Sequence, residues 1–198
     1  MAARGERARA GGESPSVEPI SQDEPAARYV AIITDGNGRW ARAHRVSVTE
    51  GHSAGADTVK ARLRDAAEFG VRELTVYSFS TENWSRAPEE VSGLMAMFSE
   101  RIAGETPELH DEGVRMRFIG RRDGVSADLV GQMDWAESLT AGNSRITLFV
   151  AFNYGGRAEI VDAARRFDGG DEEALAKIIS GVRVGTLVTS AKGDSDGG

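Results

Sequence analysis

Four short apolar runs, rich in β-branched and aromatic residues, alternate along this chain with stretches of helical hydrophobic spacing. The runs are residues 29–34, 73–79, 114–120 and 145–153. Runs of this kind predict strands of a buried sheet, and strands separated by helices predict βαβ units. We therefore expect an α/β fold with a mainly parallel sheet and helices on both faces. Ligands bind such sheets beyond the carboxyl ends of the strands, so each strand end is a candidate site.

Helix signals fill the intervals between these runs. Gly70 suits a helix stop, Pro88 with the acids after it suits a first turn, and Ser126 suits an N-cap. We expect helices over about 53–69, from Pro88 onward, over about 126–140 and over about 157–167, with a short acidic helix near Asp171.

The length of 198 residues suits one compact domain with tails. Residues 1–27 hold three of the five prolines and almost no large apolar side chains, so we expect a disordered tail there. Residues 28–180 are expected to form the α/β domain. The residues 181–198, which end in a Gly-, Ser- and Asp-rich stretch, are expected to form an irregular tail.

Charge and cysteine content exclude several classes of protein. The formal net charge of −7 argues against a nucleic-acid-binding protein, because such proteins carry an excess of Lys and Arg. The chain has no cysteine, which excludes a disulfide framework, a thiol nucleophile and cysteine-ligated zinc. No apolar run approaches the ~18 residues that a membrane-spanning helix requires, and the N-terminus does not resemble a secretory signal. We expect a cytoplasmic protein whose contact with membranes would be peripheral.

Clustered polar and aromatic residues follow three of the four predicted strands. Tryptophan and an Asn-Tyr pair are not what solvation alone selects for a loop, so this edge of the sheet is the candidate site. The first strand is followed by Asp35, Gly36, Asn37, Gly38, Arg39 and Trp40. The second is followed by Ser80, Thr81, Glu82, Asn83, Trp84 and Arg86, and the fourth by Asn153, Tyr154 and Arg157.

Two kinds of site fit the first of these clusters. Gly36-x-Gly38-x-x-Ala41 matches the G-x-G-x-x-A fingerprint of dinucleotide-binding proteins. That site needs small residues in the turn and an acid at the end of the second strand. Here Arg39 and Trp40 crowd the turn, and Glu82 lies slightly beyond the second strand. The dinucleotide hypothesis therefore has a poor sequence context.

A magnesium–diphosphate site is the second hypothesis. A leaving diphosphate needs positive charge, which Mg²⁺ on a carboxylate, main-chain N–H groups and guanidinium groups supply. Asp35 could hold the metal, since Mg²⁺ often takes only one or two protein carboxylates. Gly36 and Gly38 would let the main chain approach the phosphates, Arg39 and Arg86 would supply donors, and His52 could donate near a helix N-terminus.

The motifs at these strand ends resemble those of cis-prenyltransferases, the family of undecaprenyl and related polyprenyl diphosphate synthases. The segments "DGNGRWA", "GHSAGADTV", "YSFSTENWSR", "EVSGLM", "RFIG" and "FNYGGRAEIVDA" occur in the family's order and spacing, over about residues 29 to 167. The resemblance implies Mg²⁺-dependent condensation of isopentenyl diphosphate with an allylic diphosphate, giving a polyprenyl diphosphate with a new cis double bond. It also implies an apolar tunnel for the chain, for which Met95, Met97 and Phe98 are candidates, and a homodimer.

The resemblance assigns a role to each matching residue. Asp35 is expected to be the catalytic Mg²⁺ ligand, and Asn83 to take part in proton removal. Because an amide is a poor general base, we expect Asn83 to position a water molecule or a diphosphate oxygen. The expected substrate-binding residues are Gly36, Asn37, Gly38, Arg39, Trp40, His52, Ser80, Thr81, Glu82, Trp84 and Arg86, with Trp84 in the prenyl pocket.

This chain departs from the family in two places. Val48 stands where many members carry an arginine, a donor that Arg45 could replace. The family's C-terminal segment, with an Arg-x-x-x-x-x-Arg-x-Ser motif that binds isopentenyl diphosphate, has no counterpart in "EEALAKIISGVRVGTLVTSAKGDSDGG". We therefore expect the family's C-terminal strands to be missing. The alternative function is an impaired homologue that binds the allylic diphosphate but lacks the isopentenyl diphosphate site.

Overall fold

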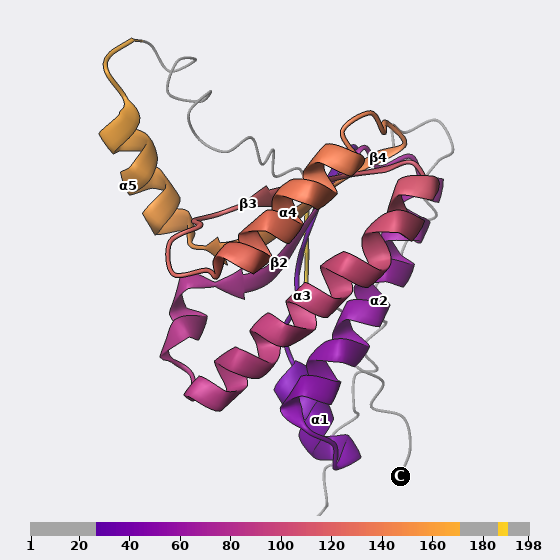
Figure 1. The fold of residues 1–198 in the computed structure, drawn as a ribbon. Helices are drawn as coiled ribbons and strands as arrows, with labels where there is room; N and C mark the ends of the chain where they lie inside the picture. Colours follow the sequence, from indigo (N-terminus) through magenta and orange to yellow (C-terminus); the bar gives the residue numbers. More distant parts are fainter. Residues whose placement is uncertain (1–26, 171–185, 190–198) are drawn as a thin grey trace, which may run out of the picture.

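The computed structural model describes residues 27–170 and 186–189, which form a parallel sheet with helices packed beside it (Figure 1). The predicted acidic helix near Asp171 and the predicted N-terminal tail, apart from Ala27, lie outside these residues. In chain order the elements are β1 (Tyr29–Ile33), α1 (Asn37–His44), α2 (Val48–Glu68), β2 (Glu73–Ser80), the 3₁₀ helix η1 (Thr81–Ser85), α3 (Pro88–Asp111), β3 (Val114–Ile119), α4 (Ala127–Leu139), β4 (Ile146–Tyr154), α5 (Gly156–Arg166) and β5 (Thr186–Thr189).

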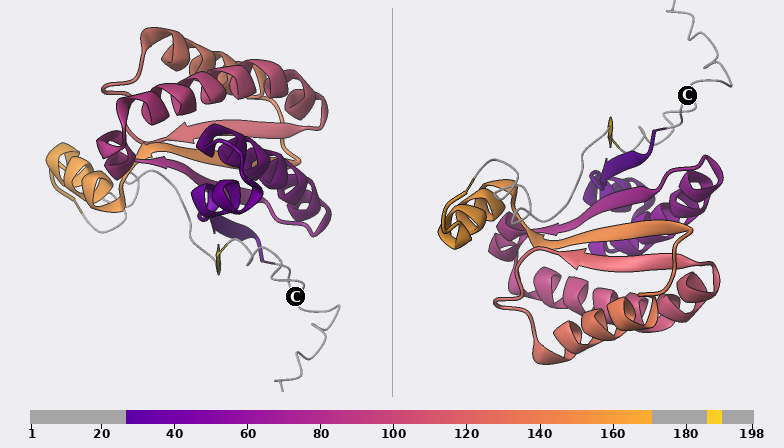
Figure 2. Two further views of the ribbon diagram at one scale, coloured as in Figure 1. Left: turned by 90° about the horizontal axis from the view of Figure 1, so that it is seen from below. Right: turned by 90° about the horizontal axis from the view of Figure 1, so that it is seen from above.

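The sheet has the strand order β3-β4-β2-β1-β5, and every pairing is parallel. Views from below and above show the strands side by side and α5 set apart at one end (Figure 2). The carboxyl ends of β1, β2 and β4 therefore meet at one edge, which places the three predicted residue clusters near one another. The predicted α/β class and parallel sheet are confirmed.

The hydrophobic core lies between the sheet and helices α2, α3 and α4. Alternate residues of β2, β3 and β4 face this layer because successive side chains of a strand point to opposite faces. Leu74, Val76, Met116 and Leu148 belong to the resulting cluster, and all four are buried. The predicted helix signals are confirmed: Pro88 is the first residue of α3, and Ser126 accepts a hydrogen bond from the Leu129 N–H at the start of α4.

Helix α4 lies against the open edge of β3. The N–H of Met116 donates to Thr140 Oγ1 at 3.0 Å, and the N–H of Phe118 donates to Glu137 Oε1 at 2.5 Å. Main-chain groups on the edge of a sheet have no neighbouring strand, so side chains from α4 and the residue after it take the place of one.

Three features differ from the sequence prediction. Helix α1 was not predicted, and α2 begins at Val48 instead of about Ser53. A capping box between Ser47 and Glu50 supplies the earlier start. The irregular tail predicted for 181–198 is wrong at Thr186–Thr189, because these residues form β5 and pair in parallel with β1. An added strand satisfies the main-chain groups that β1 would otherwise expose on its edge.

Candidate functional site

Asp35 lies just beyond β1 in a solvent-exposed corner. Its Oδ1 accepts from the N–H of Gly36 at 2.6 Å, and its Oδ2 accepts from Arg39 Nη2 at 3.2 Å. The side chain of Asp35 is 77% exposed and that of Arg39 is 72% exposed, so water screens this ion pair. Gly36 has φ +93°, a backbone conformation that favours glycine, and it turns the chain directly from the strand into α1.

The residues that we expected to form a glycine-rich turn instead begin a helix. Asn37, Gly38 and Arg39 form the first turn of α1, and Trp40 N–H donates to the Gly36 carbonyl at 2.9 Å. No side chain caps this end of the helix. A Cβ at Gly38 would meet no atom within 4 Å among the described residues, so the space beside it is open. Uncapped N–H groups and the positive end of a helix dipole attract anions.

Asn37 joins this corner to α2. Its Nδ2 lies 3.2 Å from His52 Nδ1. Its main chain and amide lie against the two glycines of α2: a Cβ would approach its carbonyl oxygen to 2.6 Å at Gly51 and its Oδ1 to 2.6 Å at Gly55. Helices α1 and α2 can pack this closely only because these two positions lack side chains.

His52 lies in the second turn of α2, not just before the helix as predicted from the sequence. The earlier start of α2 at Val48 accounts for the difference. Burial of the imidazole, with a smaller repulsive effect of Arg86, lowers the pKa of His52, and Glu90 opposes this. The ring is therefore neutral at pH 7, and with Asn37 donating to Nδ1 its proton lies on Nε2. His52 is a neutral donor and not a cation.

The second cluster forms η1, directly after β2. The N–H of Ser80 donates to Asn83 Oδ1 at 2.9 Å. The amide oxygen of Asn83 is therefore engaged, and its Nδ2 group can only donate. Thr81 lies beside Gly155, where a Cβ would approach Thr81 Oγ1 to 2.7 Å. The pKa of the Glu82 carboxyl is lowered, first by its own main-chain N–H and then by the hydroxyl groups of Ser80 and Thr81.

Trp84 and Asn153 connect η1 to the rest of the sheet. Trp84 Nε1 donates to Asn153 Oδ1 at 2.8 Å, and its ring packs edge-on against Phe79. Asn153 Nδ2 donates to the carbonyl oxygens of Arg121 and Asp123 at 3.1 and 2.9 Å. Asn153 is 4% exposed with φ +49°. The sequence placed Asn153 at the edge of the site, but its role as the junction between three segments was not predicted.

Arg86 and Trp40, two further predicted substrate-binding residues, each contact a neighbouring side chain. Arg86 pairs with Glu90, with 2.7 Å between Nη1 and Oε1. The indole of Trp40 is 40% exposed and stacks on the His44 ring with centroids 4.0 Å apart. Arg121, which follows β3, makes a two-pronged ion pair with Asp162 of α5 at 2.7 and 2.8 Å.

An apolar cavity of about 130 Å³ lies between α2, α3 and the sheet. Thr34, Asn37, His52 and Ser78 line it from the side of the carboxyl ends of the strands. Met97 and Phe98, two of the three tunnel candidates, line it too, whereas Met95 packs against the core. Among the described residues, the cavity lining includes neither Trp84 nor Asp35, although the neighbours Thr34 and Asn37 belong to it. The other lining residues are Gly55, Ala56, Val59, Lys60, Leu63, Val76, Arg101, Ile102, Glu105, Leu109, Met116, Phe118, Leu148 and Val150.

The polar corner suits a metal only together with an anionic ligand. Among residues 27–170, no three acids or histidines come close enough to hold a metal ion by themselves. Asp35 nevertheless offers an exposed carboxylate, and Mg²⁺ is commonly held by one carboxylate with phosphate oxygens and water. No helix among the described residues has the length and apolar character needed to cross a bilayer.

Curated relatives of this chain are isoprenyl transferases. A Bradyrhizobium diazoefficiens protein named "Isoprenyl transferase 2" is 46% identical over 154 residues, which are 77% of this chain and 60% of that protein. The Escherichia coli K12 protein named "Ditrans,polycis-undecaprenyl-diphosphate synthase ((2E,6E)-farnesyl-diphosphate specific)" is 43% identical over 153 residues, which are 76% of this chain and 60% of that protein. The chain thus spans about 60% of the length of these relatives.

Solved structures and a family model point the same way. Lavandulyl diphosphate synthase from Lavandula x intermedia, in complex with dimethylallyl diphosphate, has a TM-score of 0.72 and 30% identity, over 78% of this chain and 71% of that one. The fold also matches a probable undecaprenyl diphosphate synthase from Campylobacter jejuni, with a TM-score of 0.68, 21% identity, and 87% and 80% of the two chains covered. The family model described as "Putative undecaprenyl diphosphate synthase" matches residues 33–190. The chain therefore belongs to the undecaprenyl diphosphate synthase family, the cis-prenyltransferases.

Proposed function

We propose that this chain is an isoprenyl transferase, which condenses isopentenyl diphosphate with an allylic diphosphate in a Mg²⁺-dependent reaction. One observation carries the proposal: an exposed, anion-attracting corner adjoins an apolar cavity. Asn37 and His52 lie at the junction, since both line the cavity and Asn37 also begins α1. An allylic diphosphate has the same two parts, an anionic diphosphate head and an apolar chain.

The cavity fits the apolar part of such a ligand. An apolar cavity of about 150 Å³ can hold benzene, so the 130 Å³ found here holds about one five-carbon unit. A longer chain would need more room than this cavity provides.

The corner residues would bind and activate the diphosphate. The N–H groups of Asn37 and Gly38 and the guanidinium of Arg39 would donate to its oxygens, and Asp35 would hold Mg²⁺ against them. Bound there, Mg²⁺ supplies positive charge that stabilises the departing diphosphate. As the allylic C–O bond breaks and diphosphate departs with the electron pair, the double bond of isopentenyl diphosphate would form the new C–C bond, and loss of a C–H proton would then form the new double bond. Asn83 Oδ1 already accepts from the Ser80 N–H and its Nδ2 group is a donor, so we infer that Asn83 orients the proton acceptor and does not take the proton itself.

A second candidate is a homologue that binds the allylic diphosphate without condensing it. The chain spans about 60% of the length of its curated relatives, and residues 168–198 contain no Arg-x-x-x-x-x-Arg-x-Ser motif, so binding and condensation are tested separately. Of that stretch, the structure describes only 168–170 and 186–189, so the predicted loss of the isopentenyl diphosphate site otherwise lies outside the described residues. The dinucleotide hypothesis is set aside, because the chain belongs to a different family.

Two measurements separate the candidates. Incorporation of radiolabelled isopentenyl diphosphate with farnesyl diphosphate and Mg²⁺ tests condensation, and calorimetric titration with farnesyl diphosphate tests binding. Both activities together support the transferase, and binding without incorporation supports the second candidate. If farnesyl diphosphate does not bind, or binds equally well to Asp35→Ala in Mg²⁺, the proposed site is wrong.

A further inference from the structure

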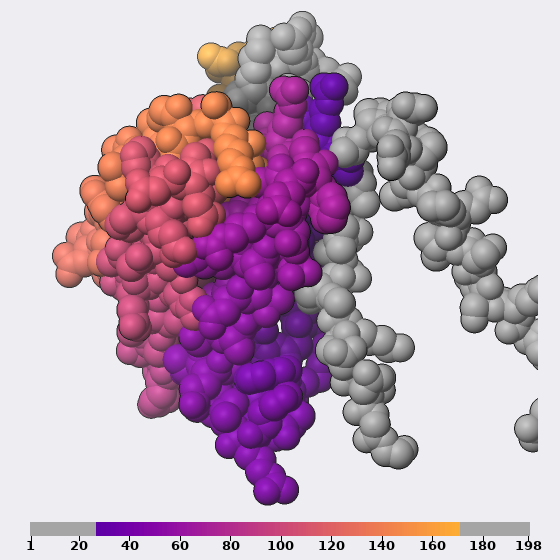
Figure 3. Space-filling model, turned by 90° about the vertical axis from the view of Figure 1, so that its right-hand side faces the viewer, coloured from indigo at the N-terminus to yellow at the C-terminus, as the bar shows by residue number. Residues whose placement is uncertain are grey.

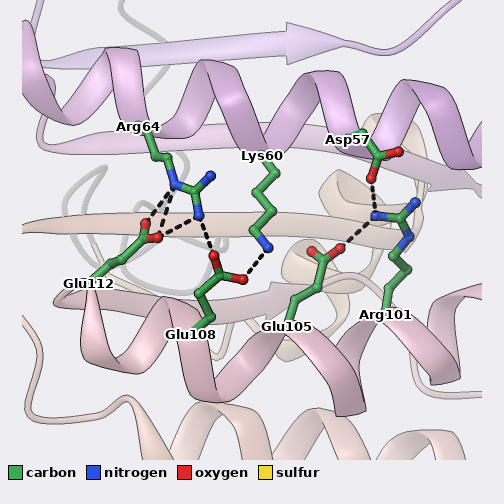
Figure 4. Close-up of polar contacts among 7 residues, drawn as sticks. All are labelled: Asp57, Lys60, Arg64, Arg101, Glu105, Glu108 and Glu112. Carbon is green, nitrogen blue, oxygen red and sulfur yellow. Dashed lines mark hydrogen bonds and ion pairs between the residues drawn. The ribbon is translucent and has the colours of Figure 1, made fainter.

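Ion pairs, not apolar packing alone, join α2 to α3 beside the cavity. Figure 4 shows seven charged side chains reaching across the gap between the two helices. In the space-filling view, the two helices meet along a common line on this side of the molecule (Figure 3). We call these residues the ion-pair seam: Asp57, Lys60, Arg64, Arg101, Glu105, Glu108 and Glu112.

Arg101 differs from the other basic residues of the seam in what it contacts. Its Nη1 donates to Asp57 at 2.5 Å and to Glu105 at 2.6 Å. Its Nη2 donates to the main-chain oxygen of Ser53 at 2.9 Å and to Ser53 Oγ at 2.6 Å. Lys60 and Arg64, by contrast, contact acidic side chains. Arg101 alone among these three thus holds the main chain of α2, at the residue after His52.

The turn of α2 that Arg101 contacts has a low intrinsic helix propensity. Gly51 and Gly55 lie on either side of Ser53, and each glycine within a helix costs roughly 1 kcal/mol relative to alanine. Two contacts from outside the helix restrain this turn. Asn37 packs on the two glycines and binds His52 from α1, and Arg101 binds Ser53 from α3.

Arg101 is not itself placed to bind a diphosphate. A guanidinium has five N–H donors, and four hydrogen bonds of Arg101 go to Asp57, Glu105 and Ser53. The two carboxylates beside it also neutralise its charge. The Arg101 side chain is 22% exposed and lines the cavity, so its contacts with Ser53 and Glu105 are partly buried, whereas Asp57 lies largely in solvent.

We propose that Arg101 is a positioning residue, which fixes the Gly51–Gly55 turn of α2 and so holds the His52 imidazole in its place in the lining of the cavity. The proposal rests on the proposed function, since the ligand that His52 would meet there is the allylic diphosphate. Lysine cannot replace Arg101 in this role, because one ammonium group cannot bind both Ser53 oxygens and both acids in the same geometry.

A matched pair of variants tests the proposal. Arg101→Lys and Arg64→Lys each keep the positive charge and each disturb the seam, but only Arg101 contacts Ser53. Calorimetric titration with farnesyl diphosphate measures binding, and NMR titration of the imidazole measures the pKa of His52. Displacement of a binding group by about 1 Å can cost up to about 100-fold in function, so we expect binding at least ~10-fold weaker in Arg101→Lys and unchanged in Arg64→Lys.

The pKa of His52 supplies a readout that does not need the substrate. If the turn loosens, the ring becomes hydrated and its pKa rises toward the ordinary value in Arg101→Lys but not in Arg64→Lys. Ser53→Ala, which removes only the Oγ contact, should give a smaller change of the same sign. Equal behaviour of the two lysine variants in both assays overturns the proposal. A wild-type chain that does not bind farnesyl diphosphate overturns the proposed function instead, while the His52 titration still decides whether Arg101 positions the ring.

Discussion

Replacing Gly51 with alanine tests whether close packing of α1 on α2 builds the corner of the site. A Cβ at Gly51 would lie 2.6 Å from the main-chain oxygen of Asn37 and 2.8 Å from the Cβ of Ala41. Both are parts of α1 that cannot rotate away, and Ala41 is fully buried. Gly51→Ala must therefore push α1 off α2 or strain one of the two helices.

The size of the effect follows from comparison with Gly104, an exposed glycine within α3. A Cβ at Gly104 would meet nothing within 4 Å among the described residues. Gly104→Ala should therefore raise the free energy of unfolding by roughly 0.5–1 kcal/mol, because alanine stabilises a helix by that amount relative to glycine. Gly51→Ala has the same gain but adds an overpacking cost of about 1–3 kcal/mol. The difference between the two variants isolates that steric cost.

Urea unfolding of both variants and the wild type measures this difference. We expect Gly104→Ala to be more stable than the wild type and Gly51→Ala to be less stable than Gly104→Ala by about 1–3 kcal/mol. Gly51→Ala should also bind farnesyl diphosphate more weakly, because α1 carries the N–H groups and Arg39. A Gly51→Ala variant stabilised as much as Gly104→Ala would refute the packing argument.

Three further predictions concern the site. Asp35→Asn should weaken farnesyl diphosphate binding in Mg²⁺ but not in EDTA, as measured by calorimetry, because only the metal-bound complex needs the carboxylate. Trp84→Phe should lower the free energy of unfolding by about 1–3 kcal/mol in urea titrations, since it leaves the buried Asn153 Oδ1 without its donor. The pKa of His52 is lowered on folding, so the unfolded chain takes up a proton at this residue more readily than the folded chain. The free energy of unfolding therefore falls as the pH drops below the ordinary pKa of about 6.5. The wild type should therefore lose more stability than His52→Gln between pH 7.5 and 5.5, and equal losses would contradict this.

Local sequence patterns predicted the strands and most of the helices. The apolar runs gave β1 to β4 nearly to the residue, and the first-turn proline at Pro88 and the N-cap at Ser126 gave two helix starts. These signals succeed because they act within a few residues of the chain. The same holds for the strand-end clusters, which the parallel sheet brings to one edge.

Helix α1 was missed because its stability is not local. Gly36 and Gly38 are poor helix residues, and no side chain caps the helix, so the segment resembles a turn. The helix is stabilised by the packing of Asn37 and Ala41 against Gly51 and Gly55, which belong to a different helix, α2. The contacts of Arg101 with Ser53 and Asp57 were missed for the same reason, since they join residues 44 or more positions apart.

The hydrogen bonds from β3 to Thr140 and Glu137 also bear on how the molecule meets other chains. An exposed strand edge invites a strand from another molecule, which leads to aggregation or to strand exchange. At β3 the N–H groups of Met116 and Phe118 are already bound to side chains from the α4 region, so an incoming strand would have to displace them. Intermolecular strand addition is therefore disfavoured at this end of the sheet, and replacing Thr140 and Glu137 with apolar residues would remove that protection.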